Sequence, residues 1–339
     1  MTFSTNGSFS TKISSLSLDS YFAQNKIQSD LPVNFSLSEE HLTLKEGVIT
    51  NTSKQELVVF ADLSLANLLA LQSSCQFSID ALLAINTRNK QTSYRFNISC
   101  QNFIKSRKAL ADFALAQKIE AALIQNAPKL SEPGLLVMDM DSTTIEIECI
   151  DEIAKLAGVG EQVAAVTELA MQGELDFAQS LHQRVGTLKD APEQILADVA
   201  KNIPLMAGLE TLICELKKHN WRIAVASGGF TYFADHLKEM LALDATFANV
   251  LEIVNGQLTG KVLGSVVDAQ VKADSLKLLA EKYQIPASQT VAMGDGANDL
   301  IMMAAASFGV AFHAKPIVLA QADSSINQEG LDCLLHWLA

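Results

Sequence analysis

Three apolar runs in the second half of the chain are each followed at once by polar or acidic residues. Short runs of this kind are typical of buried strands. We predict strands over Leu135–Met138, Arg222–Ser227 and Thr290–Met293. Stretches suited to helices lie at Leu209–His219, Ala273–Tyr283 and Leu300–Ala306. Strands that alternate with helices favour an α/β fold around a parallel sheet.

The segment between the first two strands reads as a separate group of helices, at about residues 146–203. Gly158 and Gly173 are placed to end helices, and Asp176 is placed to begin one. Further on, Asn255 and Gly256 interrupt an apolar stretch, and this pair favours a tight primed turn. We therefore predict a helical insertion, followed later by a hairpin.

The first part of the chain has a different pattern and ends in a linker, Ala127–Gly134, which contains two prolines. Residues 1 to about 50 are rich in Ser, Thr and Asn, and we expect them to be partly irregular. A strand, a helix, a second strand and a long helix are predicted at Leu57–Ala61, Leu63–Leu71, Ser93–Ile98 and Lys105–Gln125. The chain is therefore predicted to contain an α/β domain over residues 1–130 and a larger domain over residues 131–339.

Composition restricts the partners of the protein. The chain has 339 residues, 49% of them hydrophobic, and a formal net charge of −13. This charge argues against nucleic acid and anionic membrane as partners. The five cysteines form no C-x-x-C pair, which indicates reduced thiols in the cytoplasm and gives no zinc signature. No apolar run is long enough to span a bilayer, and no secretory signal is apparent.

Candidate chemistry begins where the first strand ends. Asp139 and Asp141 lie two residues apart, so both share one side if the strand continues. Crowded carboxylates repel unless a cation or a reaction uses them, and Mg²⁺ prefers such oxygen ligands. One Asp can attack phosphorus while the other transfers a proton. Taken alone, the pair could equally cap the helix that follows.

The later strands end in residues that complement this pair. Ser227 and Gly228 precede a helix, where backbone N–H groups can hold phosphate oxygens. Lys272 is expected to open the helix at Ala273 and to supply a positive charge. After the third strand come an aspartate, an amide and a second aspartate among glycines, at Asp295, Asn298 and Asp299. The carboxyl ends of strands in an open α/β sheet form one crevice, so these residues can meet.

Four ordered motifs, D-x-D-S-T, S-G-G, a lone lysine and G-D-G-x-N-D, resemble the haloacid dehalogenase superfamily of phosphohydrolases over residues 133–330. The resemblance implies a Rossmann-like parallel sheet with a helical cap. It also implies that Asp139 is the nucleophile and Asp141 the general acid and base. Mg²⁺ would be held by Asp139, Asp295 and the backbone carbonyl of Asp141, and Asp299 would bind it or orient water around it. Ser227, Gly228, Lys272 and Asn298 would hold the phosphate or substrate.

The segment after the first motif is similar to the cap of the phosphoserine phosphatase family. That similarity implies that Glu148 and Arg184 hold the amino-acid end of the substrate, beneath Met171 and Phe177. An arginine fork suits a carboxylate, and a carboxylate suits an ammonium group. Other interpretations remain open, because Glu148 lies in an acidic run typical of a solvated face. Arg184 fits a surface ion pair, and Met171 and Phe177 fit an ordinary core.

The resulting hypothesis is a cytoplasmic hydrolase of O-phosphoserine that forms an aspartyl-phosphate, in the last step of serine biosynthesis. A phosphotransferase, a broad-specificity phosphomonoesterase and a non-catalytic amino-acid sensor are the alternatives. Some phosphoserine phosphatases carry an N-terminal ACT-type regulatory domain, and residues 1–130 resemble it in placement. A domain for dimerisation or packing fits this segment equally well, and a homodimer is left open.

Overall fold

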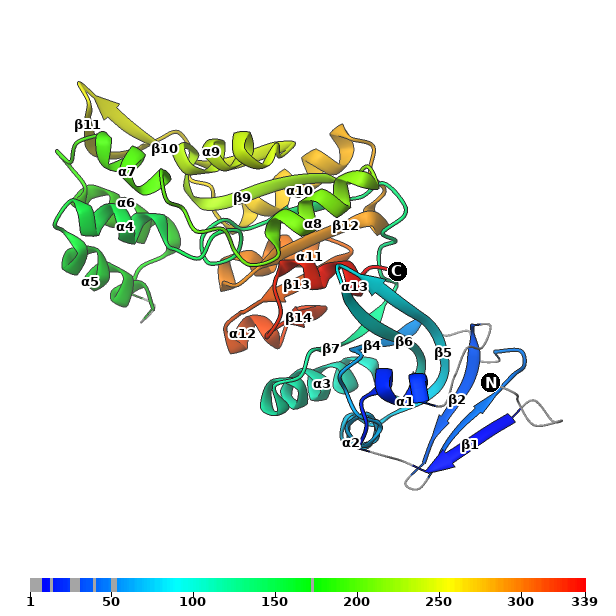
Figure 1. Ribbon diagram of the computed structural model, residues 1–339. Helices are drawn as coiled ribbons and strands as arrows, with labels where there is room; N and C mark the ends of the chain where they lie inside the picture. Colours follow the sequence, from blue (N-terminus) through cyan, green and yellow to red (C-terminus); the bar gives the residue numbers. More distant parts are fainter. Residues whose placement is uncertain (1–7, 13–14, 25–30, 39–40, 50–53, 172–173) are drawn as a thin grey trace. The chain divides into compact units, whose positions relative to one another are not determined.

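The computed structural model in Figure 1 describes residues 8–12, 15–24, 31–38, 41–49, 54–171 and 174–339. The chain forms two compact units. The first contains the residues up to Ala127 together with Asp323–Ala339, and the second is Pro128–Ala322. The last segment of the chain is thus grouped with the first unit, whereas the division expected from sequence assigns it to the second.

A sheet whose central strands are parallel organises the second unit. Its strands are β8 (Leu135–Met138), β9 (Arg222–Phe230), β10 (Ala245–Val254), β11 (Gln257–Leu263), β12 (Thr290–Gly294) and β13 (Phe308–Phe312). They lie in the order β11-β10-β9-β8-β12-β13, and β11 alone of these six is antiparallel to its neighbour. The order reverses between β8 and β12, which is the place where α/β sheets bind ligands.

Helices pack against this sheet and explain why three of its strands are buried throughout. They are α8 (Leu209–Lys218), α9 (Thr231–Leu241), α10 (Ala269–Lys282), α11 (Leu300–Ala305) and α12 (Pro316–Leu319). Every residue of β8, β12 and β13 is buried, as expected for strands covered on both faces. One prediction is wrong, because Lys272 does not open α10. Asp268 caps this helix by accepting the N–H of Val271 at 2.9 Å, so Lys272 lies in its first turn.

Four helices form the predicted insertion between β8 and α8. They are α4 (Cys149–Leu156), α5 (Gly160–Met171), α6 (Phe177–Thr187) and α7 (Gln194–Ala200). Asp176 begins α6 in a reciprocal capping box with Gln179, and Gly158 follows α4 with a φ of +72°. Gly173 lies outside the described residues.

The predicted hairpin joins β10 to β11. Asn255 and Gly256 both have positive φ, 54° and 75°, which agrees with the predicted primed turn. Gly260 of β11 is required by close packing, because a Cβ there would lie 3.2 Å from the carbonyl oxygen of Gly186 in α6. Figure 1 shows the hairpin beside α6 and α7. We refer to α4–α7 with this hairpin as the cap.

The first unit contains an antiparallel sheet with helices. Its central part is β4 (Gln55–Phe60), α2 (Leu65–Cys75), β5 (Phe77–Arg88), β6 (Gln91–Cys100), α3 (Phe103–Gln117) and β7 (Ala121–Gln125). The strand order β5-β6-β4-β7 makes this a β-α-β-β-α-β sandwich. The sheet continues beyond β5 through β2 (Val33–Leu37), β3 (His41–Lys45) and β1 (Ser8–Lys12), and α1 (Leu18–Gln24) precedes β2. A small α/β sandwich is what the ACT resemblance implies, and a regulatory role stays a prediction.

The long helix expected over Lys105–Gln125 is wrong in its second half. The helix ends at Gln117, where Lys118 adopts a left-handed conformation with φ +53°. Residues Ala121–Gln125 instead form β7, which pairs with β4. The apolar run in this strand is buried in the sheet, and a short apolar run does not distinguish a strand from a buried helix.

The C-terminal segment of the chain contains β14 (Ser324–Ile326) and α13 (Leu334–Trp337) and is held by buried charges of the first unit. Arg95 donates from Nη2 to the carbonyl oxygens of His336, Trp337 and Leu338 at 3.0, 3.0 and 2.7 Å, and it pairs with Glu56 through Nη1. Glu120 accepts backbone N–H groups from residues 327, 328 and 329 through one carboxylate oxygen. Side chains far apart in sequence thus fix the end of the chain.

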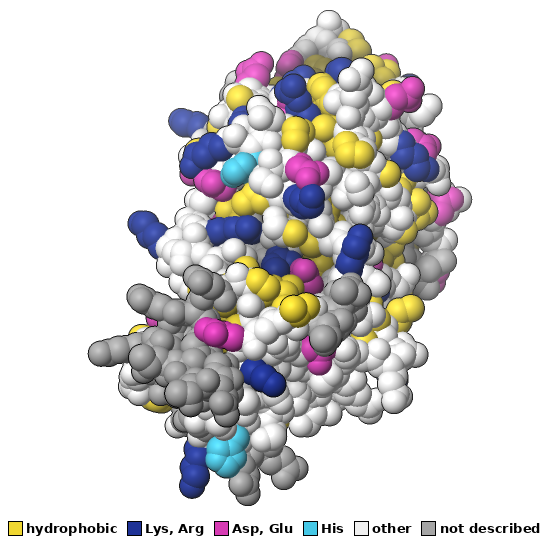
Figure 2. All heavy atoms as spheres, turned by 90° about the vertical axis from the view of Figure 1, so that its right-hand side faces the viewer, with side chains coloured by type: hydrophobic (Ala, Val, Ile, Leu, Met, Phe, Trp, Pro, Cys, Tyr) yellow, Lys and Arg dark blue, Asp and Glu magenta, His cyan; other side chains and the backbone are white. Residues whose placement is uncertain are grey.

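The surface mixes charges of both signs. Figure 2 shows basic side chains interspersed with acidic ones and with scattered hydrophobic ones on one face. Among the described helices, none is both long enough and apolar enough to cross a membrane. The expectation that the protein binds no nucleic acid stays a prediction.

Candidate active site

The candidate site lies at the carboxyl ends of β8 and β12, where the strand order reverses. Asp139 follows β8, and its N–H donates to the carbonyl oxygen of Met293 at 2.9 Å, which ties the two strand ends together. Carboxylate oxygens of Asp139, Asp295 and Asp299 all lie within 4.8 Å of one another. The structure therefore brings together acids that are more than 150 residues apart in sequence.

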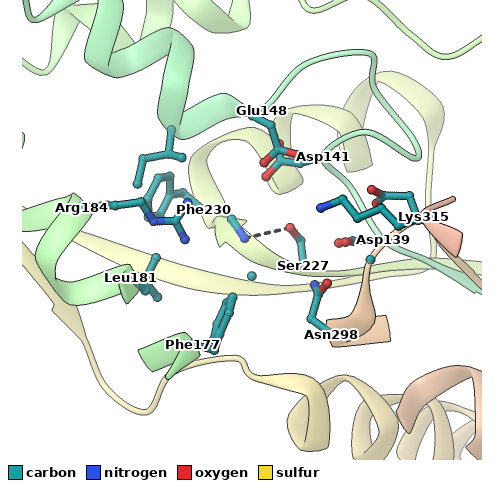
Figure 3. Close-up of a pocket in the computed structure, with 15 residues that line it drawn as sticks. Asp139, Asp141, Glu148, Phe177, Leu181, Arg184, Ser227, Phe230, Asn298 and Lys315 are labelled. Carbon is teal, nitrogen blue, oxygen red and sulfur yellow. Dashed lines mark hydrogen bonds between the residues drawn. The ribbon is translucent and has the colours of Figure 1, made fainter. Parts of the chain in front are cut away.

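Asp139 is held in one orientation. The side chain is 8% exposed, and its Oδ1 accepts the N–H of Met140 at 2.7 Å and the ammonium group of Lys272 at 2.9 Å. Among the described residues, the polar contacts of this carboxylate involve Oδ1. These contacts leave Oδ2 available for an incoming group. Figure 3 shows Asp139 at the edge of the pocket.

Lys272 lies behind Asp139 and is fully buried. Its Nζ also contacts Oδ1 of Asp299 at 2.8 Å, and Oδ2 of Asp299 accepts the N–H of Gly296 at 3.0 Å. Burial alone lowers the pKa of Lys272, but Asp139 and Asp299 outweigh it and raise this pKa above its usual value. Lys272 therefore carries its charge as part of a buried Asp–Lys–Asp group. Both oxygens of Asp299 are engaged in holding this group.

Asp141 is suited to donate a proton. Its Oδ1 accepts the N–H of Cys149 at 3.1 Å, at the start of α4. Burial, followed by the charges of Glu148 and Asp139, raises the pKa of Asp141 to about 8. The carboxyl group is therefore largely protonated at neutral pH, as a general acid must be before it acts.

Consecutive glycines after Ser227 allow the backbone to approach the pocket closely. Ser227 Oγ accepts the N–H of Gly229 at 2.8 Å, a contact drawn in Figure 3. A Cβ on Gly228 would lie 2.5 Å from the ring of Phe177 in the cap. A Cβ on Gly229 would lie 2.8 Å from a carboxylate oxygen of Asp141. A side chain at Gly228 would therefore separate the cap from the core, and a side chain at Gly229 would displace Asp141.

The cap contributes side chains to the other side of the pocket. Glu148 accepts the hydroxyl of Ser142 at 2.8 Å. Arg184 points into the pocket from α6, and its Nε is buried with no hydrogen-bond partner among the described residues. Burial lowers the pKa of Arg184, and nearby carboxylates oppose that effect. An anionic partner would satisfy this guanidinium group. The side chain of Met171, also predicted for the cap, lies outside the described residues.

These side chains surround one cavity of about 250 Å³. Nine of the twelve predicted site residues line it: Asp139, Asp141, Glu148, Phe177, Arg184, Ser227, Gly228, Asp295 and Asn298. Lys272 and Asp299 lie behind the lining. Sequence reasoning missed Lys315, which lines the pocket beyond the end of β13, and the apolar side chains Ile150, Leu181 and Phe230. The apolar strand Phe308–Phe312 just before Lys315 was the available signal, because it adds a fourth strand end to the crevice.

The fold and the site define the class of this protein. The family model described as haloacid dehalogenase-like hydrolase matches residues 134–307, and the chain belongs to this family. The chain is 61% identical over 216 residues to the phosphoserine phosphatase of Vibrio cholerae, a match that covers 64% of this chain and 66% of that protein. It is 59% identical over 222 residues to the phosphoserine phosphatase of Haemophilus influenzae, and this match covers 66% of this chain and 71% of that protein.

A solved structure extends the likeness to more of the chain. The crystal structure of a probable phosphoserine phosphatase from Vibrio cholerae, in unliganded form, matches with a TM-score of 0.72 at 47% identity. That match covers 86% of this chain and 88% of the other. The predicted fold class and the predicted resemblance to phosphoserine phosphatases of this superfamily are confirmed.

The acidic side chains also fit a metal ion. Hydrolases of this family generally use a divalent metal ion, and the cluster of Asp139, Asp295 and Asp299 offers the oxygen donors that such ions prefer. Burial, followed by the charge of Asp139, raises the pKa of Asp295. Its Oδ1 also accepts the hydroxyl of Thr143 at 3.3 Å. A bound cation would offset the repulsion between these carboxylates.

Proposed function

We propose that the chain hydrolyses O-phosphoserine to serine and phosphate through an aspartyl-phosphate. The observation that carries this proposal is a single pocket with two kinds of lining. The core side contains an oriented Asp139 beside a proton donor, Asp141, and the cap side contains Glu148 and Arg184. The identities to phosphoserine phosphatases support the same activity. As such an enzyme, the protein catalyses the last step of serine biosynthesis.

In the first half of the reaction, Oδ2 of Asp139 attacks phosphorus, and the bond from phosphorus to the serine oxygen breaks. Asp141 gives its proton to the leaving oxygen, so serine departs as a neutral alcohol. The raised pKa of Asp141 keeps this proton in place until it is needed. The contacts of Lys272 and of the Met140 N–H with Oδ1 direct the other oxygen of Asp139 toward the substrate.

In the second half, Asp141 acts as a base and takes a proton from water. The resulting hydroxide attacks the phosphorus of the aspartyl-phosphate, phosphate leaves, and Asp139 is restored as a carboxylate. The N–H groups after Ser227 and the charge of Lys272 stabilise the oxygens of the phosphoryl group during both transfers. Asn298 lines the pocket near these oxygens and contacts substrate or phosphate.

The metal in this proposal is Mg²⁺. Asp139, Asp295 and the backbone carbonyl of Asp141 would hold it, while Asp299 positions Lys272 and would orient water near the ion. When bound, the ion neutralises charge on the phosphoryl group.

The cap binds the amino-acid part of the substrate. Arg184 has a buried donor without a partner among the described residues, and a substrate carboxylate supplies one. Glu148 offers a carboxylate to the ammonium group. Phe177 contacts the core at Gly228 and excludes water from the pocket. Because Arg184 complements the substrate carboxylate and Glu148 complements its ammonium group, the pocket favours phosphoserine over phosphates that lack an amino-acid group.

The test is phosphate release from O-phospho-L-serine with Mg²⁺ or with EDTA, beside sugar and nucleotide phosphates. Magnesium-dependent release that strongly prefers phosphoserine is the expected result. Equal release across the panel would indicate a broad-specificity phosphatase and would remove the proposed role of the cap. Phosphate found on an added acceptor alcohol, and not in solution, would indicate a phosphotransferase.

A further inference from the structure

The charges that line the pocket are unevenly distributed. The lining contains four acidic side chains, Asp139, Asp141, Glu148 and Asp295, and two cationic side chains, Arg184 and Lys315. Phosphoserine brings two anionic groups at its opposite ends, a carboxylate and a phosphate. Each of them must displace water and enter a pocket rich in negative charge. Each therefore requires local positive charge, of which the proposed metal ion would supply a part for the phosphate.

Lys272 shares its charge with two carboxylates behind the pocket. Its side chain is 1% exposed, and its Nζ contacts Oδ1 of both Asp139 and Asp299 at 2.9 and 2.8 Å. Neither Lys272 nor Asp299 lines the cavity. The charge of Lys272 thus acts on Asp139 and reaches the phosphoryl group from behind it. A further cationic side chain that contacts the phosphate oxygens would have to come from the lining.

Lys315 is presented from a rigid part of the backbone. Its N–H donates to the carbonyl oxygen of Asp295 at 3.3 Å. Its own carbonyl oxygen accepts the N–H groups of Val318 and Leu319 at 2.9 and 3.1 Å, and Pro316 follows at the first position of α12. Val318 is fully buried and anchors this turn. The Cα of Lys315 is therefore fixed beside Asp295, while its long side chain remains exposed to solvent.

The side chain extends into the pocket from the side opposite to the cap. Figure 3 shows Lys315 directed toward the space between Asp141 and Ser227, across the pocket from Arg184. The charge of Lys315 also acts on its neighbour. Although burial and Asp139 raise the pKa of Asp295, Lys315 opposes this rise. The two lining cations are therefore at separate places, one in the cap and one in the core.

We propose that Lys315 binds an outer phosphoryl oxygen of phosphoserine and of the product phosphate. This inference rests on the proposed function, because it takes the phosphate to lie between Asp139 and Ser227. Arg184, with a planar fork, suits the carboxylate, whereas Lys315, a compact charge on a flexible stem, can follow the phosphate as it transfers. Lys315 is thus a substrate-binding residue in addition to those expected from the motifs.

The experiment compares Lys315→Met with Lys315→Arg and with a control, Lys277→Met. Lys277 is an exposed lysine of α10, so its replacement changes the net charge equally without touching the pocket. The readouts are KM and kcat for phosphoserine at saturating Mg²⁺, and inhibition by inorganic phosphate and by serine. A lost contact between a charged donor and phosphate should raise KM and the phosphate inhibition constant about tenfold or more. Inhibition by serine should be unchanged, and Lys315→Arg should restore much of the phosphate affinity.

Several results would overturn the inference. One is unchanged inhibition by phosphate in Lys315→Met. Another is an equal loss of serine inhibition, which would indicate a distorted pocket. A third is recovery of normal KM when Mg²⁺ is raised further, because Lys315 would then act through the metal site. Calorimetric binding of inorganic phosphate to the wild type and to Lys315→Met tests the inference without turnover. Its outcome is therefore separate from a failure of phosphoserine hydrolysis.

Discussion

Two buried groups of charges, one in each unit, show how similar residues serve different purposes. In the second unit, Lys272 joins Asp139 and Asp299. In the first unit, Arg95 joins Glu56. The two cationic side chains are nearly equally buried, at 1% and 5% exposure. Burial and ion pairing therefore do not by themselves distinguish a site from a structural cluster.

The difference lies in what completes each group. Three backbone carbonyls of the C-terminal segment accept from Nη2 of Arg95, and Nε alone of its nitrogens is buried without a partner among the described residues. In the second unit, Asp139 keeps an oxygen toward a cavity of about 250 Å³ that three further carboxylates also line. The two groups differ in their surroundings, because the carboxylate of Asp139 faces an open cavity whereas the guanidinium group of Arg95 faces backbone carbonyls of the chain itself.

The largest effect is expected for Asp139→Asn. An amide cannot form the aspartyl-phosphate, so turnover should fall by on the order of 10⁴-fold or more. The melting temperature should stay close to that of the wild type, because the amide oxygen can still accept the Met140 N–H. Steady-state phosphate release measures the turnover, and thermal unfolding measures the melting temperature. Asp274→Asn, an exposed acid on α10, is the matched control and should retain full activity.

Arg95→Met should show the opposite behaviour, with stability lost and chemistry kept. Removing the buried cation leaves Glu56 and three carbonyl oxygens without their partner, which should lower the free energy of unfolding by about 3–5 kcal/mol. Urea unfolding measures this loss, and kcat of the folded fraction should not change. Arg107→Met is the control, because its ion pair with Asp323 is partly exposed and should contribute less than about 1 kcal/mol. Equal losses in both variants would contradict the comparison.

Arg184→Met should affect specificity. A charge-assisted pair with the substrate carboxylate contributes about 1.5–3 kcal/mol, so kcat/KM for phosphoserine should fall by roughly 10–100-fold. Phosphoethanolamine has no carboxylate, and its slower hydrolysis should change little. The ratio of the two kcat/KM values measures the effect. An equal loss of kcat/KM for both substrates would mean that Arg184 holds the cap closed and does not bind the carboxylate.

Acid should weaken the first unit through His336. Burial, followed by the charge of Arg88, lowers the pKa of His336 to about 4, below the value of about 6.5 in an unfolded chain. Between these two values the unfolded state binds more protons, so stability falls as the pH falls through this window. The loss from this residue should be about 2 kcal/mol between pH 7 and pH 5. Urea unfolding at both pH values should show a smaller loss for His336→Gln than for the wild type.

The sequence predicted those parts of the site that depend on local pattern. Asp139, Asp295 and Asn298 follow apolar strands, and strand ends in a parallel sheet converge, so their meeting could be expected. The burial of Lys272 could not be predicted, because it depends on two features of the folded chain. Asp268 begins α10 one turn earlier than expected, and the helix packs against β8. Lys315 was missed because the apolar strand before it, Phe308–Phe312, was not among the predicted strands.

Long-range packing also explains what was missed in the fold. The strand β7 is a short apolar run that follows closely on a helix, and only pairing with β4 decides that Ala121–Gln125 is extended. The contacts of Arg95 with the C-terminal segment join residues more than 240 positions apart, and no local sequence pattern predicts them. Interactions of this length depend on the tertiary structure as a whole.

In the proposed mechanism, Asp139 forms a covalent bond to phosphorus during hydrolysis of phosphoserine. The most direct measurement is rapid acid quenching of the enzyme during turnover with O-phospho-L-serine and Mg²⁺, followed by peptide mass spectrometry. We expect one phosphoryl group on the peptide that contains Asp139, located on that residue and absent from Asp139→Asn. Turnover with a phosphoryl group on another residue, or hydrolysis by Asp139→Asn at the wild-type rate, would contradict it.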